Sequence, residues 1–195
     1  IVVGLLIAVG LEQTVEYFHH RSEVNEARER IRTELEGDRG AIRKNSAQLQ
    51  KDMAKWTAYG MQLSDTKVTA EQVGAMDFSW FLLLESNSAW ENTKQSNTFS
   101  YMPPAEAEMY AYFYRVLAED YAVATRYIED VRTADAIVQR VHATHVLTPS
   151  DRERLIAMVD MLNGRAKNQV DLYQFLDEGL GIWLEQHRMI NMRQN

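Results

Sequence analysis

The sequence predicts an all-α protein. In this fold an N-terminal transmembrane helix continues into a long helical stalk, which packs with a helical bundle that contains a long antiparallel hairpin. Good helix formers abound, whereas the 195 residues include only three prolines and nine glycines. Apolar residues recur at steps of three, four and seven over long stretches. The apolar fraction of 46% suffices for a real core, which argues against a disordered chain.

The first predicted element is a transmembrane anchor over residues 1–21. The run IVVGLLIAVGL precedes the first charge, at Glu12, and at about 1.5 Å per residue it covers roughly half of a ~30 Å hydrocarbon core. We therefore expect the apolar segment to begin before residue 1. A cleaved signal peptide and a buried helix of a soluble domain are the two alternatives to an anchor.

Two groups of residues near this segment are candidate contacts. An aromatic pair is followed by polar and basic groups, as in the belt that lines a membrane–water interface. The predicted membrane-interface residues are Tyr17, Phe18, His19, His20 and Arg21. Gly4 and Ala8 are small residues one helical turn apart, a spacing that lets another transmembrane helix approach closely, and they are candidate partner contacts.

A helical stalk is predicted over residues 22–66. Apolar residues repeat there every seven positions, at Leu35, Ile42, Leu49, Trp56 and Leu63. The second seam that a coiled coil needs is mostly polar, at Asp38, Asn45, Asp52 and Tyr59. We therefore expect the stalk to pack against its own domain instead of forming a dimeric coiled coil. Gly37 and Gly40 each disfavour a helix by about 1 kcal/mol relative to Ala, which predicts bending or a short break.

A helical bundle domain is predicted over residues 67–195. Thr69 followed by Gln72 has the spacing of a capping box, which indicates a helix start. The continuously apolar run at 78–84 has no polar face, so we expect it to be buried, as a helix.

The next helix is predicted to start at a second capping box, formed by Ser88 and Glu91. It should end within the polar segment 95–100. Pro103 and Pro104 then suit the first turn of a further helix, because proline lacks the amide hydrogen that this turn leaves unpaired.

Two long amphipathic helices complete the bundle. After the proline pair, apolar residues follow at steps of three and four as far as residue 141, which is the clearest helical pattern of the chain. Thr148 and Pro149 form a helix cap and a first-turn proline, and a second periodic stretch runs to residue 184. We expect these helices to form an antiparallel hairpin.

No catalytic residue, cofactor, metal site or small-molecule substrate is identified, and we expect the chain not to be an enzyme. His142 and His145 are three positions apart, and Glu16 and His19 have the Glu-x-x-His spacing of di-iron bundles. Neither pair has the further ligands that a site requires. The absence of cysteine excludes thiolate chemistry, and the net charge of -7 argues against a nucleic-acid partner.

Aromatic residues gather in the helix after the proline pair, on more than one of its faces. They are Tyr110, Tyr112, Phe113, Tyr114, Tyr121 and Tyr127. Rings outside the core face must contact another segment or a partner, and tyrosine suits a partner surface because it combines apolar area with a hydrogen-bonding tip. The candidate partner contacts are Tyr112, Tyr114 and Tyr127.

Three pieces of the chain carry a resemblance. They are the opening IVVGLLIAVGLEQTVEY, the segment Ser88-Ala89-Trp90-Glu91, and Ser100-Tyr101-Met102 before the Tyr-rich helix. In this order they resemble a group of uncharacterised bacterial single-pass inner-membrane proteins with an N-terminal transmembrane helix and a soluble helical domain. The resemblance implies a single-pass protein of the bacterial inner membrane and implies no activity or ligand.

These observations predict a membrane-anchored helical interaction module that serves as an accessory or stabilising subunit of a larger membrane protein complex. Its expected partners are the lipid bilayer and other membrane-protein subunits, or a second copy of the chain. A single-pass signalling or stress-sensing protein is the alternative, and a metal-dependent helical enzyme is less favoured. The arginines after the span favour a cytoplasmic domain, whereas the plan of the similar proteins favours the periplasm, so both orientations stay open.

Overall fold

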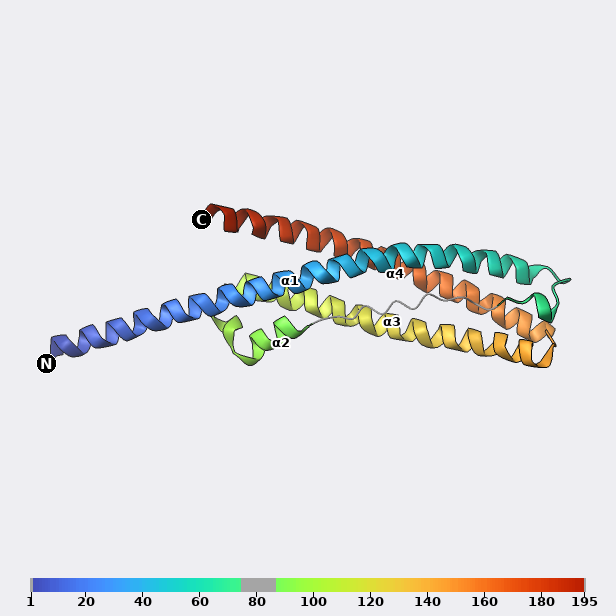
Figure 1. The fold of residues 1–195 in the computed structure, drawn as a ribbon, viewed down its shortest axis with the longest axis horizontal. Helices are drawn as coiled ribbons and strands as arrows, with labels where there is room; N and C mark the ends of the chain where they lie inside the picture. The colour runs from blue at the N-terminus through green and yellow to red at the C-terminus, as the bar shows by residue number, and fades with distance from the viewer. Residues whose placement is uncertain (1, 75–86, 195) are drawn as a thin grey trace. The chain divides into compact units, whose positions relative to one another are not determined.

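The computed structural model describes residues 2–74 and 87–194, and side-chain surroundings within 10–74 and 87–186. These residues form the helices α1 (Val2–Ser64), α2 (Ser88–Gln95), α3 (Pro104–Thr144) and α4 (Pro149–Gln194), and the short 3-10 helices η1 (Ala70–Gln72) and η2 (Thr98–Tyr101) (Figure 1). The described part of the chain contains no strand, so the predicted all-α class is confirmed.

The chain divides into two compact units. Unit 1 consists of Ile1–Asp38 and Glu85–Ala118, and unit 2 of Arg39–Leu84 and Glu119–Asn195. Each unit therefore combines a part of α1 with a part of α3, to which unit 1 adds α2 and unit 2 adds α4. The predicted sequence segments 1–21, 22–66 and 67–195 stay a prediction.

Helix α1 is continuous through Gly37 and Gly40, so the predicted short break does not occur. Leu35 and Ile42, which flank the two glycines, are fully buried. Burial of a Leu or Ile side chain stabilises a structure by about 1.5–3 kcal/mol, which offsets the cost of a helical glycine. Tertiary packing therefore overrides the weak local propensity.

The inner face of α1 is wider than its apolar repeat predicts. Of the five repeat positions, Leu49 is half-buried and the other four are buried. Asp38, Asn45 and Asp52, which belong to the polar seam, are also buried, with exposed fractions of 4%, 7% and 2%. The polar seam thus faces inward beside the apolar one. Trp56 belongs to the core of unit 2, which confirms that the stalk packs against its own bundle.

The short segments follow the predicted capping boxes only in part. The backbone N–H of Thr69 donates to the side chain of Gln72 at 2.9 Å, as the first box predicts, although the element it opens is a single 3-10 turn. The second box is wrong. Asn87 is the N-cap of α2, so Ser88 is already the first residue of the helix, and its hydroxyl donates to Glu34 of α1. The apolar run 78–84 lies outside the described residues.

Within unit 2, α3 and α4 form the predicted antiparallel hairpin, visible as the yellow and orange helices in Figure 1. The backbone N–H of Asp151 donates to the Thr148 hydroxyl at 3.1 Å, which confirms the helix cap. The Asp151 carboxylate also forms an ion pair with Arg140 across the turn between α3 and α4. Valines of α3 and apolar residues of α4, including Leu155 and Leu162, share one core.

Over the described residues, no helix has an apolar stretch long enough to cross a bilayer.

Candidate functional site

The part of α1 that precedes the core presents apolar side chains to solvent. Every described side chain from residue 10 to residue 19 is exposed, and the first buried residue is Val24. The large apolar members of this stretch, which we call the collar, are Leu11, Val15, Tyr17 and Phe18, with exposed fractions of 62%, 68%, 61% and 60%. They alternate with exposed polar residues, among them Glu12 and Glu16, and large apolar side chains gathered at the surface are typical of interaction or membrane sites.

The turn η2 lies next to the collar. The rings of His20 and Tyr101 stack with their centroids 3.7 Å apart and their planes 14° from parallel. Phe99 and Tyr101 are 38% and 48% exposed, so this turn adds two aromatic side chains to the same end of unit 1. Phe99 and Tyr101 are not among the predicted interface residues. The signal that could have found them is the spacing of two aromatic residues within an otherwise polar loop.

The predicted interface residues share this end of the unit. His19 and His20 both contact the carboxylate of Glu23, at 3.2 and 3.1 Å. Arg21, like the collar, is exposed. The predicted residues therefore lie together on one part of α1, where all but the half-buried His20 are exposed.

A second candidate feature depends on one carboxylate of α1. Glu34 Oε1 accepts a hydrogen bond from the hydroxyl of Tyr114 at 2.6 Å, and Oε2 accepts from the Ser88 hydroxyl at 2.9 Å and the Ala89 backbone N–H at 3.1 Å. The negative carboxylate also suits the positive end of the α2 dipole. Glu34 thereby joins α1, the start of α2 and α3.

The aromatic residues of α2 and α3 pack on this carboxylate. The Trp90 and Tyr114 rings stack with an interplanar angle of 5° and a centroid distance of 5.9 Å. Burial raises the pKa of Tyr114, and its hydrogen bond to Glu34 raises that pKa further. Tyr114 therefore stays protonated and donates to the carboxylate at any ordinary pH.

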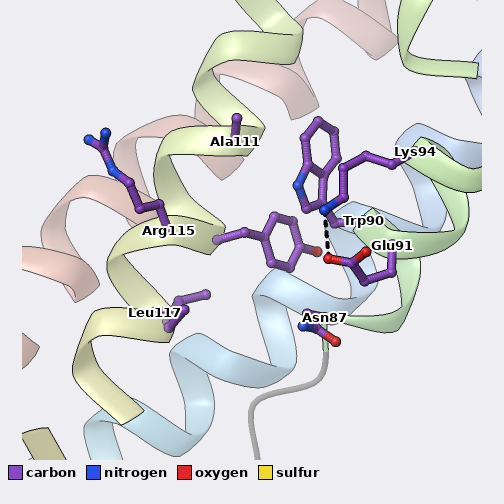
Figure 2. A pocket seen from close by; sticks show the side chains of 9 residues that line it. Asn87, Trp90, Glu91, Lys94, Ala111, Arg115 and Leu117 are labelled. Carbon is purple, nitrogen blue, oxygen red and sulfur yellow. Dashed lines mark hydrogen bonds and ion pairs between the residues drawn. The ribbon is translucent and has the colours of Figure 1, made fainter. Parts of the chain in front are cut away.

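A groove of about 260 Å³ lies between α2 and α3 of unit 1. Figure 2 shows Trp90, Glu91 and Lys94 on α2 and Ala111 and Arg115 on α3, with the Arg115 side chain extending away from α2. The groove is lined by Asn87, Trp90, Glu91, Lys94, Ala111, Tyr114, Arg115, Leu117 and Ala118.

The charges of this groove are partly paired. Lys94 contacts Glu91 at 2.7 Å and lies 6.0 Å from the centre of the Trp90 ring. The Arg115 guanidinium lies 5.5 Å from the ring centre of Tyr112, which is 41% exposed. The groove thus offers a partner an aromatic wall with the Lys94–Glu91 ion pair at its edge, and Arg115 and Tyr112 form an exposed cation–aromatic surface next to it.

The candidate partner contacts have different surroundings. Tyr112 lies on the surface, and its role as a partner contact stays a prediction. Tyr114 is buried in unit 1, and Tyr127 is half-buried in unit 2 with its ring 5.7 Å from that of Trp56. These two rings pack inside the chain, because their helix positions face α1 as well as the other helices. Gly4 and Ala8 lie outside the residues whose side-chain surroundings are described.

The histidine pair does not converge on a shared site. His142 donates from Nε2 to the backbone carbonyl of Val73, whereas His145, with a positive φ of 54°, is exposed 3.9 Å from Glu71. Within 10–74 and 87–186, no three His, Asp or Glu side chains are grouped as metal ligands. Glu16 is exposed and lies between the collar residues Val15 and Tyr17.

No protein family, curated protein or solved structure matched this chain. The assignment of a role therefore depends on the geometry of the collar and of the groove.

Proposed function

We propose that this chain is a membrane-anchored helical interaction module, an accessory or stabilising subunit of a larger membrane protein complex. The observation that carries this proposal is the collar. Four large apolar side chains, each at least 60% exposed, continue the apolar run that starts at residue 1. Removing such side chains from water stabilises by about 1.5–3 kcal/mol each, so a bilayer is a favourable environment for them.

The groove and Tyr112 supply the surface for a protein partner. Tyrosine, tryptophan and arginine are enriched in protein interfaces, and this surface combines Trp90, Tyr112 and Arg115. The side chains of Lys94 and Arg115 are both exposed. A partner segment that presents an apolar side chain and a carboxylate would match both the aromatic wall and the cations.

We assign the chain to the bacterial inner membrane as a single-pass protein. The resemblance of its opening segment and of its Ser-Ala-Trp-Glu segment to single-pass proteins supports this localisation. The partners are the lipid bilayer and other membrane-protein subunits.

A single-pass signalling or stress-sensing role is the second candidate. The observation that favours it is the continuity of α1 from Val2 to Ser64, because an unbroken helix transmits rotation and translation along its axis. One inserted residue after Glu26 rotates the following residues by about 100°. Loss of a downstream response in this variant, with normal membrane association, would favour sensing over a stabilising role.

The experiment that tests the subunit role is extraction from native membranes in mild detergent, followed by native gel separation and mass spectrometry. We expect the chain to co-migrate with a defined set of membrane proteins. The double variant Lys94→Glu and Arg115→Glu should lose these partners, whereas Lys167→Glu, an exposed control on α4, should retain them. A solitary chain in the native gel would contradict the proposal.

A further inference from the structure

We propose that η2 is a second membrane contact, in which Phe99 and Tyr101 lie in the headgroup layer beside α1. This inference rests on the proposed membrane anchor and deepens it. A single helix leaves the attached domain free to tilt and turn over the bilayer. A second contact would give unit 1 a fixed face towards the lipid surface.

The turn η2 is held in place by its first residue, Thr98, and by its C-cap, Met102. Thr98 and Met102 are buried, with exposed fractions of 4% and 5%, whereas Phe99 and Tyr101 between them are 38% and 48% exposed. The Thr98 hydroxyl hydrogen-bonds Ser96 at 2.8 Å. The burial of Thr98 and Met102 leaves Phe99 and Tyr101 on the exposed side of the turn, where Tyr101 stacks on His20.

The stack between Tyr101 and His20 determines the position of η2 along the axis of α1. Val15 is the last aliphatic member of the collar, and position 20 lies about 8 Å further along the helix axis at 1.5 Å per residue. The headgroup layer on each side of the hydrocarbon core is about 5–8 Å thick. With Val15 at the hydrocarbon boundary, the rings of His20 and Tyr101 reach the headgroup layer.

The chemistry of this end suits an uncharged lipid surface better than an acidic macromolecule. Glu12, Glu16 and Glu23 outnumber Arg21 at this end, and the two histidines count as neutral at pH 7, so the end is acidic and disfavours an anionic surface. Tyrosine rings are favoured at the membrane interface because one end is apolar and the other bonds to water or headgroups. A bilayer of zwitterionic phospholipid is therefore the occupant that this surface fits.

The natural chain has no cysteine, so a single cysteine can be labelled at one chosen position. We would label the variants Leu11→Cys, Phe99→Cys and Tyr112→Cys with an environment-sensitive fluorophore in the full chain, reconstituted in phosphatidylcholine vesicles. Quenching by aqueous iodide reports access from water. Tyr112 serves as the matched control, because it is also an exposed aromatic residue of unit 1 but lies on α3 beyond η2.

We expect the labels at positions 11 and 99 to be protected from iodide several-fold relative to the label at position 112. Protection at 99 should also require vesicles and be absent in the vesicle-free chain. If position 11 is protected and position 99 is quenched as strongly as position 112, the second contact is refuted while the anchor stands. If position 11 is itself fully quenched, the proposed anchor fails, and this inference fails with it.

Discussion

The carboxylate of Glu34 and the hydroxyl of Tyr114 form a hydrogen bond of 2.6 Å between α1 and α3 of unit 1. The same carboxylate binds the first residues of α2. One acidic side chain therefore connects three helices and positions the Trp90 wall of the groove.

Removal of the Tyr114 hydroxyl should lower the stability of the chain. A hydrogen bond to a charged group contributes about 1.5–3 kcal/mol, and in Tyr114→Phe the carboxylate loses this donor. Equilibrium urea unfolding in mild detergent should show a loss of this size. Tyr112→Phe, which alters an exposed ring, should change the free energy of unfolding by about 0.5 kcal/mol or less. Equal effects of the two variants would contradict the role of Tyr114.

Removal of the Glu34 carboxylate should loosen α2. In Glu34→Ala the Ser88 hydroxyl and the Ala89 amide lose their acceptor, so the eight-residue helix loses its attachment to α1. Hydrogen exchange followed by mass spectrometry should show faster exchange in 88–95. Glu36→Ala, which removes a surface pair with Arg32, is the control and should leave exchange in α2 unchanged.

The buried carboxyl of Asp120 should make the stability depend on pH. Burial raises the pKa of Asp120 from 3.8 to about 6, although the hydrogen bond from Gln169 acts in the opposite direction. The folded chain therefore holds this proton more tightly than the unfolded chain. Its contribution to stability is fully present below about pH 4 and is lost as the pH rises through about 6, with a total change of about 3 kcal/mol.

Asp120→Asn isolates this effect, because asparagine imitates the protonated acid. Urea unfolding at a series of pH values from about 4 to 7.5 should show a smaller fall in the variant than in the natural chain. Asp171→Asn, at an exposed position of α4, should retain the natural profile. An unchanged profile in Asp120→Asn would show that other groups cause the pH dependence.

Arg152 should hold the end of α1. Its guanidinium donates to the backbone carbonyls of Leu63, Asp65 and Val68, which no longer have partners within a helix. Arg152→Lys keeps the charge but loses the planar set of donors, so we expect a loss of about 1–3 kcal/mol in the free energy of unfolding. Arg154→Lys, two positions later and exposed, should be neutral in the same thermal or urea measurement. Similar losses in both variants would refute the specific role of Arg152.

The long helices could be predicted from the sequence because their signals are local. The proline pair at 103–104 and the Thr148 cap determine where α3 and α4 begin, and the three-four periodicity gives their inner faces. The sequence did not predict that the polar seam faces inward at Asp38, Asn45 and Asp52. A polar residue in an amphipathic helix is by default assigned to the solvent side. Its burial depends on helices far away in the sequence.

The candidate site was predictable only at its N-terminal end. The aromatic and basic residues after an apolar run are a local pattern, so Tyr17 to Arg21 could be identified. The groove requires Glu34 to meet Ser88 and Tyr114, which are more than fifty positions away. The position of Tyr101 likewise depends on a stack with His20 that no local pattern indicates.

Flotation of the full chain with phosphatidylcholine vesicles on a density gradient tests whether the collar anchors the chain to a membrane. We expect the chain to rise with the vesicles in high salt. A variant with Leu11→Glu and Val15→Glu should float less than a control with Met61→Glu and Ile182→Glu, which are equally exposed apolar positions outside the collar. A natural chain that stays at the bottom of the gradient, or equal flotation of the two variants, would contradict membrane anchoring through the collar.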